Sequence, residues 1–211
     1  MEPTRLVALL AALLMGAVLV GCGDGPGDET GGAPSDELSG YTRDPAPDVS
    51  EVVLPAAPGD GEVGMVADPG GLRVVYFGYT SCPDVCPTTM ADLKRALASL
   101  PEEQAERVSF VMVTVDPERD VPEKMEAYVT TFIEGGEWAR TEDDALLRSA
   151  AQEFGADYAV TTTEDGEIEV SHSAELYAVD DTGEVVLQWP FGISAESLAS
   201  DIAALLEGQR A

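Results

Sequence analysis

Two apolar runs and the helix between them constrain the fold of this chain most. The runs at residues 73–78 and 108–115 are continuous rather than alternating, which is typical of strands covered on both faces. Between them, apolar side chains recur at three- and four-residue spacing and predict an amphipathic helix: Met90, Leu93, Leu97 and Leu100. Strand, helix and strand in this order predict a parallel pair at the centre of an α/β sheet.

Helices and strands continue to alternate further along the chain. Helices are predicted to begin at Asp120, at about Asp143 and at Ser194, with Asp120 and Ser194 as N-terminal caps. Four more strands are predicted at residues 157–162, 167–171, 175–179 and 184–189. The order of these elements matches a thioredoxin-like fold, in which helices flank a central mixed sheet.

One folded domain is predicted at residues 48–211, because the chain has 211 residues, of which 45% are hydrophobic, enough for a single core. The domain opens with a hairpin-like extension, since residues 52–54 and 64–66 flank a stretch rich in Gly, Pro and Asp. Residues 22–47 consist mainly of Gly, Pro, Ser, Thr and acidic residues, which cannot build a core. This stretch is predicted to be a flexible acidic tether.

Residues 1–21 are predicted to be a lipoprotein signal peptide. Arg5 precedes an apolar run at residues 6–20, which is shorter than the ~20 residues of a spanning helix. The run ends in Leu-Val-Gly before Cys22, and this sequence resembles the bacterial lipobox, where a peptidase cleaves before a cysteine whose thiol carries lipid. The alternative is an uncleaved short anchor with an incidental cysteine. We expect export and a lipid anchor at Cys22, on the extracytoplasmic side of the cell membrane.

The charge of the chain restricts its partners. Lys and Arg number 11 against 40 acidic residues, a formal net charge of -29. Such a charge repels nucleic-acid phosphates and anionic lipid surfaces, so a nucleic-acid partner is not expected. The charge is typical of simple surface solvation, including that of proteins in salty habitats, but also of an acidic face that recognises a basic or metal-loaded partner.

Cys82 and Cys86 are the chemically most informative pair. They lie four positions apart where a buried strand is predicted to turn into a helix beginning at Pro87. At that helix edge the macrodipole is expected to stabilise the Cys86 thiolate. The spacing allows either a disulfide or shared chelation of one metal ion. Lipidation of Cys22 would leave these two as the remaining thiols of the three cysteines.

The ligand types favour copper over a structural zinc ion. Two sulfur ligands suit Cu(I), and an added imidazole permits Cu(II), whereas a structural zinc site usually has four protein ligands. The chain has one histidine, His172, at the end of a predicted strand. On position alone, a lone histidine is more often structural than a metal ligand.

Three blocks of sequence resemble the SCO/SenC family of copper proteins. They are residues 76–87 (Tyr-Phe-Gly-Tyr-Thr-Ser-Cys-Pro-Asp-Val-Cys-Pro), residues 115–120 (Val-Asp-Pro-Glu-Arg-Asp) and His172-Ser173. The resemblance covers residues 72–190 and departs from the family pattern at residues 52–66, where the usual opening strand is replaced. It implies a thioredoxin-like fold that binds one copper through Cys82, Cys86 and His172 and helps to assemble the dinuclear copper centre of cytochrome c oxidase.

Three classes of function remain open from the sequence. A metallochaperone would pass copper to the copper-bearing subunit of cytochrome c oxidase, and a thiol reductant would have to keep its cysteines reduced. A thiol-disulfide oxidoreductase would use Cys82 and Cys86 to reduce the acceptor's cysteines. A permanent disulfide would only staple the loop. Asp116 is a further candidate, as a group that orients His172 or tunes the charge near the copper.

Overall fold

The computed structural model describes residues 38–56 and 61–208. The predicted signal peptide, Cys22 and most of the predicted tether therefore lie outside the described residues. Among the helices that are described, none is long and apolar enough to cross a membrane.

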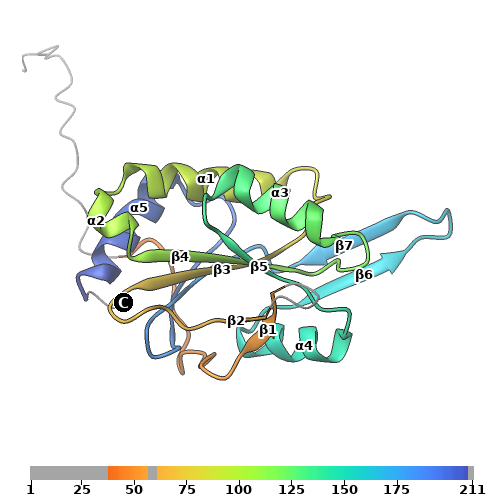
Figure 1. Cartoon of the computed structure of the whole chain (residues 1–211), viewed down its shortest axis with the longest axis horizontal. Helices are drawn as coiled ribbons and strands as arrows, with labels where there is room; N and C mark the ends of the chain where they lie inside the picture. The colour runs from red at the N-terminus through yellow and green to blue at the C-terminus, as the bar shows by residue number, and fades with distance from the viewer. Residues whose placement is uncertain (1–37, 57–60, 209–211) are drawn as a thin grey trace, which may run out of the picture. The chain divides into compact units, whose positions relative to one another are not determined.

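A five-stranded mixed sheet forms the centre of the domain (Figure 1). Its order is β5-β4-β3-β8-β9, with β3 parallel to β4 and antiparallel to β8. The two apolar runs form the central strands, whose side chains are almost all buried. The strands are Leu72–Gly78 (β3), Val108–Thr114 (β4), Glu137–Ala139 (β5), Leu176–Val179 (β8) and Val185–Trp189 (β9). The predicted thioredoxin-like arrangement of a mixed sheet between helices is confirmed.

Helices cover both faces of this sheet (Figure 1). On one face, α1 packs against α3 and α5, and on the other face α4 lies beside the small β1–β2 hairpin. Their bounds are Val85–Ser99 (α1), Glu102–Ala105 (α2), Pro122–Phe132 (α3), Asp144–Glu153 (α4) and Ala195–Leu206 (α5). Asp143 and Ser194 cap α4 and α5 with their side chains, and the cap at Ser194 was predicted. Neither α2 nor β5 was predicted.

The N-terminal hairpin is confirmed, with β1 at Val53–Pro55 and β2 at Glu62–Gly64. The tether, however, ends earlier than predicted. The Tyr41 N–H donates to the carbonyl oxygen of Gln188, and the N–H groups of Ser39 and Gly40 donate to the buried Asp201 carboxylate. Residues 38–47 therefore lie against the domain, and the boundary predicted at residue 47 is wrong by about ten residues.

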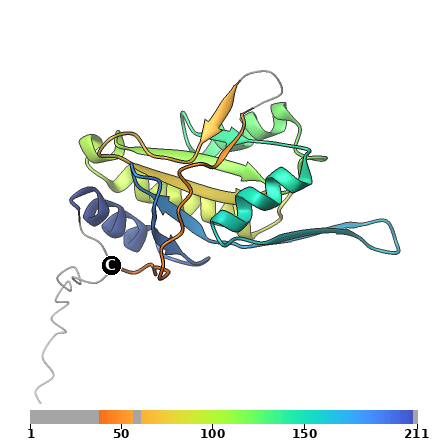
Figure 2. The same ribbon diagram turned by 90° about the horizontal axis from the view of Figure 1, so that it is seen from below.

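A separate two-stranded ribbon leaves the domain beside the sheet. It is formed by β6 (Tyr158–Thr162) and β7 (Ile168–His172), which pair antiparallel, and it extends away from the layers of the domain (Figure 1, Figure 2). In the part of the chain that the structure describes, neither strand pairs with the five-stranded sheet. His172 is the last residue of the ribbon and returns the chain to the domain.

Candidate metal centre

The two cysteines lie at the junction of β3 and α1. Cys82 is half-buried in the connecting loop, and Cys86 is fully buried in the first turn of α1. The helix begins at Val85, so the prediction that Pro87 is its first residue was wrong by two positions. Proline is tolerated there because the N–H groups of the first helical turn have no intrahelical acceptor.

Asp120 holds the start of this loop in place from inside the protein. Its carboxylate is completely buried and accepts hydrogen bonds from the Thr80 N–H at 3.0 Å and the Thr80 hydroxyl at 2.5 Å. It also accepts a bond at 2.6 Å from the hydroxyl of Thr114, the last residue of β4. The prediction that Asp120 caps the next helix is wrong: Val121 occupies the N-cap position of α3, without a side-chain cap. Asp120 instead ties the loop to the central sheet.

His172 reaches the cysteines from the end of the ribbon. Its Nδ1 lies 2.8 Å from the carbonyl oxygen of Ser173, and because a carbonyl only accepts, Nδ1 carries the proton. The lone pair of Nε2 then faces the Cys86 Sγ at 3.5 Å. Burial lowers the pKa of His172, although its bond to Ser173 opposes this shift. The imidazole is therefore neutral at neutral pH, the form that binds metals.

The three side chains converge. Ligand atoms of Cys82, Cys86 and His172 all lie within 4.8 Å of one another. The rings of Tyr76 and Tyr79 meet the imidazole edge-on, with centroids at 6.0 and 5.8 Å, and fix its orientation. Two sulfurs and a neutral imidazole nitrogen form a donor set that fits a soft metal ion such as copper.

The two thiols differ in acidity. Burial opposes ionisation of Cys82, but hydrogen bonds from the N–H groups of Cys86 and Asp84 and from neighbouring side chains outweigh it and lower the pKa. The Cys86 N–H lies 3.3 Å from the Cys82 Sγ. For Cys86, burial raises the pKa to about 12. The prediction that the helix edge stabilises the Cys86 thiolate is therefore wrong, and in the metal-free protein the helix terminus favours the Cys82 thiolate instead.

Asp116 lies in the same region but contacts other groups. Its carboxylate accepts a short charge-assisted hydrogen bond from Arg119, whose guanidinium lies over the Tyr79 ring at 5.8 Å. Burial raises the pKa of Asp116, although Arg119 opposes the shift. The His172 Nδ1–H donates to the carbonyl oxygen of Ser173 and not to Asp116.

A family model described as SCO1/SenC matches residues 61–207. The chain belongs to the SCO1/SenC family. An SCO2-like protein of Rickettsia prowazekii is 29% identical over 131 residues, which are 61% of this chain and 63% of that protein.

Two solved structures from this family share the fold. The apo Sco1 protein of Thermus thermophilus is 33% identical, with a TM-score of 0.70 over 82% of this chain and 99% of that one. ScoI of Bradyrhizobium japonicum, solved with copper bound, is 28% identical, with a TM-score of 0.61 over 72% of this chain and 95% of that one.

Three residues of this SCO1/SenC site were not singled out from the sequence. Thr80 and Thr114 bind Asp120, and Ser173 accepts from His172. Thr80 and Ser173 lie inside the sequence blocks that resemble the family, close to the proposed ligands, and this position could have identified them. Thr114 gave none, because a threonine at the end of an apolar strand is unremarkable in sequence.

Proposed function

We propose that this chain is a copper-binding metallochaperone whose ligands are Cys82, Cys86 and His172. The observation that carries the proposal is the convergence of these three side chains, from a loop, a helix and a ribbon, within 4.8 Å. Copper is the cargo rather than a resident cofactor. The copper-bound relative from Bradyrhizobium japonicum and the donor set of two sulfurs and an imidazole support copper as the metal.

The same geometry suits release as well as binding. Cys86 is buried, whereas Cys82 and His172 are only half-buried, so an acceptor would approach copper from their side. An incoming thiolate can displace a ligand through that open side, and a three-ligand site leaves room for it. We infer that the acceptor is the copper-bearing subunit of cytochrome c oxidase, as the family resemblance implies. Delivery takes place outside the cytoplasm, with the chain anchored to the cell membrane by lipid on Cys22.

A thiol-disulfide oxidoreductase is the second candidate, and the unequal thiols favour it. In this reaction the Cys82 thiolate attacks an acceptor disulfide, and one acceptor thiolate leaves. The Cys86 thiol, after losing its proton to solvent, then attacks the mixed disulfide and releases the second acceptor thiolate. Two electrons pass to the acceptor, and the chain is left with a Cys82–Cys86 disulfide. Both functions require a thiol reductant as partner, because that disulfide cannot bind copper.

Anaerobic copper titration tests the first function. The protein would carry Cys22→Ser, so that Cys82 and Cys86 are its remaining thiols. We expect one copper per chain and, with Cu(II), a thiolate-to-copper charge-transfer absorption. Cys86→Ala should weaken binding by about a hundredfold or more, since groups that merely orient a ligand already contribute 10–100-fold. Weak binding without charge transfer in the reduced parent protein would contradict the proposal.

His172→Ala separates the two functions. A chaperone loses much of its copper affinity on this change, whereas a dithiol reductase keeps most of its rate, since the imidazole is not one of the exchanging sulfurs. The readouts are copper affinity and the rate of reduction of a disulfide-containing oxidase domain. Phe191→Leu, which changes an exposed aromatic side chain in the loop before α5, is the control.

A further inference from the structure

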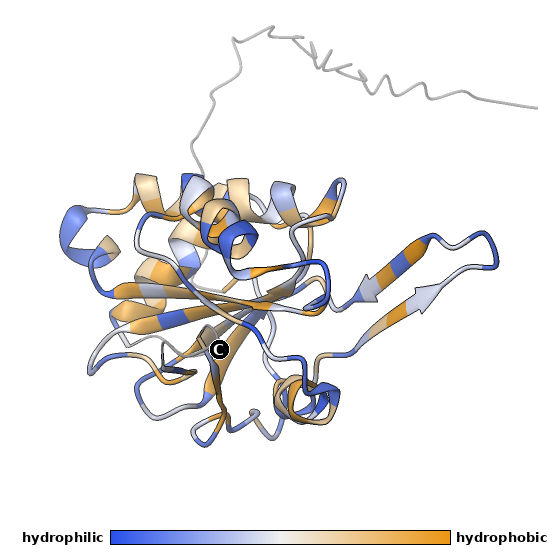
Figure 3. Cartoon of the chain, turned by 45° about the vertical axis from the view of Figure 1, so that its right-hand side comes forward, coloured by the Kyte–Doolittle hydropathy of each residue, from blue (hydrophilic) through white to orange (hydrophobic). Residues whose placement is uncertain are grey.

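The β6–β7 ribbon exposes apolar side chains to solvent, which a ribbon without a binding partner would not need. Val160 faces Val170 across the strands, and Thr162 faces Ile168. Val160 is 42% exposed and Ile168 is 39% exposed. Figure 3 shows the ribbon standing clear of the layers of the domain, with hydrophobic segments on its strands. An isolated two-stranded ribbon is only marginally stable in water unless its apolar face is covered.

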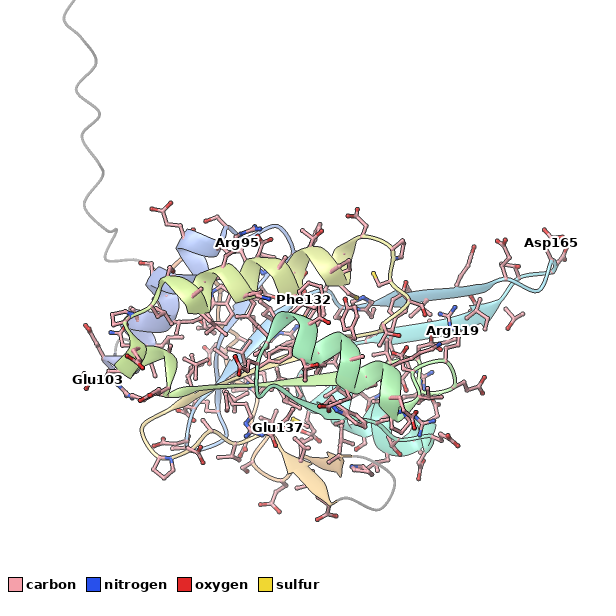
Figure 4. The ribbon with its side chains drawn as sticks, turned by 45° about the horizontal axis from the view of Figure 1, so that its top comes forward. Arg95, Glu103, Arg119, Phe132, Glu137 and Asp165 are labelled. Atoms are coloured by element: carbon pink, nitrogen blue, oxygen red, sulfur yellow. The ribbon has the colours of Figure 1, made fainter. Side chains whose placement is uncertain are left out.

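The outer part of the ribbon is also anionic. Residues 158–172 contain four acidic residues and neither lysine nor arginine: Glu164, Asp165, Glu167 and Glu169. Asp165 lies at the tip, and Arg119, which is ion-paired with Asp116, lies near the base (Figure 4). A partner that covers this ribbon must therefore offset a concentrated negative charge.

The space between the ribbon and the cysteine loop is open. A groove of about 530 Å³ is lined by Ser81 and Pro83 from the loop and by Ala159, Thr161 and Ser171 from the ribbon. The rest of the lining is Tyr79, the apolar Ile168 and Val170, and the charged Arg119 and Glu169. An extended segment of another protein can therefore approach Cys82 along the ribbon through a groove that offers both apolar and charged contacts. The ribbon itself ends at His172. Whatever binds the ribbon is thus brought to the proposed copper site.

We propose that the β6–β7 ribbon is the docking arm for the copper acceptor, and that this partner is a protein with basic side chains around an apolar patch. The inference rests on the proposed function. The net charge of -29 argues against the other occupants, because a second copy of this chain, a nucleic acid and an anionic membrane would all be repelled. The basic residues of the partner pair with the four acidic residues of the ribbon, and its apolar patch covers Val160 and Ile168.

The charge is tested by a neutral ribbon with four substitutions: Glu164→Gln, Asp165→Asn, Glu167→Gln and Glu169→Gln. The control removes four exposed acidic residues from other elements: Glu103→Gln, Glu106→Gln, Glu134→Gln and Glu207→Gln. Full-length chains would be mixed with the soluble copper-binding domain of the oxidase subunit from the same organism. We expect the neutral ribbon to slow association about tenfold at low salt and to flatten its salt dependence. The control should stay within twofold of the parent protein.

The apolar contact is tested by Val160→Thr with Ile168→Thr, which keeps β-branched side chains in the strands. Dissociation of the oxidase domain should become about tenfold faster, with the salt dependence retained. Val53→Thr with Leu146→Gln, two exposed apolar residues elsewhere, is the matched control and should have no effect.

Copper affinity, docking and copper transfer are measured separately in each variant. All ribbon variants should bind copper as the parent protein does, which shows that the site has folded. If copper passes to the oxidase domain at equal rates from the neutral ribbon and from the parent protein, the docking proposal fails while the chaperone function stands. If the domain docks on the ribbon but takes no copper, the delivery function fails and the docking arm stands. If the oxidase domain does not bind the parent protein, the docking proposal is wrong.

Discussion

The loop that carries the two cysteines and the ribbon that carries the histidine are built differently. The loop lies over the central sheet and is tied to it by Asp120, whose buried carboxylate accepts three hydrogen bonds. The ribbon stands away from the sheet, with apolar and acidic side chains in water. Its base is tied to α4 by the Tyr158 hydroxyl, which donates to Asp144 at 2.8 Å.

This difference assigns distinct roles to the proposed ligands. Two sulfurs sit on elements whose positions are set by the core, whereas the imidazole sits at the base of a projecting arm. Groups held by a core move little, and projecting elements with few buried contacts open most readily. A partner that binds the ribbon would therefore act on His172 first and leave Cys82 and Cys86 in place.

Asp120→Ala should have the largest effect on stability, because it removes the carboxylate that ties the cysteine loop to the central sheet. The change leaves the N–H and hydroxyl of Thr80 and the hydroxyl of Thr114 without their acceptor in a buried site. We expect the free energy of unfolding to fall by about 3 kcal/mol, as for other buried donors that lose a charged partner. Urea unfolding measures this loss. Asp165→Ala, at the exposed tip of the ribbon, should change it by less than about 0.5 kcal/mol.

Alkylation rates sharpen the contrast within the cysteine pair. In the metal-free, reduced protein with Cys22→Ser, Cys82 should react with iodoacetamide about a hundredfold faster than Cys86 at neutral pH. Cys82 is half-buried and has a lowered pKa, while burial raises the pKa of Cys86 to about 12. The alkylation rate of Cys82 should reach half its maximum below pH 9, which is the usual pKa of a cysteine thiol. Mass spectrometry of the labelled peptides gives both rates, and equal rates would refute the assigned asymmetry.

Parts of this contrast were visible in the sequence and parts were not. The apolar runs of β3 and β4 predicted the rigid centre, because a continuous hydrophobic strand has few places to go except a buried sheet. Asp120 was misassigned because aspartate is a preferred N-cap residue, whereas Pro122 begins the helix and places the cap at Val121. Its actual partner, Thr80, lies 40 residues earlier, and only the fold brings the two together.

Residues 38–47 were misassigned for a related reason. Their composition is that of a tether, and composition carries no information about backbone pairing. This stretch is held through its own main-chain N–H groups, which any sequence provides: Tyr41 donates to a main-chain carbonyl, and Gly40 donates to the buried carboxylate of Asp201. The ribbon, in contrast, was predicted as two strands, but its projection from the domain depends on the absence of a neighbouring strand, which no local pattern encodes.

Tyr158→Phe tests how far the ribbon depends on its base. Tyr158 lies opposite His172 in the strand register, and its ring also packs under Arg148 at 4.6 Å. Loss of the hydroxyl should cost about 1 kcal/mol of unfolding free energy. If that whole loss were transmitted to His172, copper affinity would fall about fivefold. Titration of the variant against Phe191→Leu measures it. A loss close to fivefold would show that the base of the ribbon is rigidly coupled to the copper site, and no loss would show that it is not.

Asp116→Asn has the smallest expected effect and decides which group orients the histidine. The His172 Nδ1–H donates to the Ser173 carbonyl oxygen, and Glu175 rather than Asp116 is the carboxylate whose charge acts on the pKa of His172. We therefore expect copper affinity to change by less than about threefold, whereas loss of a true orienting group costs 10–100-fold.

Because the chain has a single histidine, its titration can be followed without overlap from other imidazoles. The imidazole proton signals in an NMR titration of the metal-free protein report one pKa, and Asp116→Asn should leave it where it is in the parent protein. A shift in that pKa together with a tenfold loss of copper affinity would place Asp116 in the site after all. If neither changes, the Asp116 carboxylate positions Arg119. The Arg119 guanidinium lies over the Tyr79 ring, and that ring contacts the imidazole edge-on. Arg119→Gln should then loosen the imidazole slightly more than Asp116→Asn does.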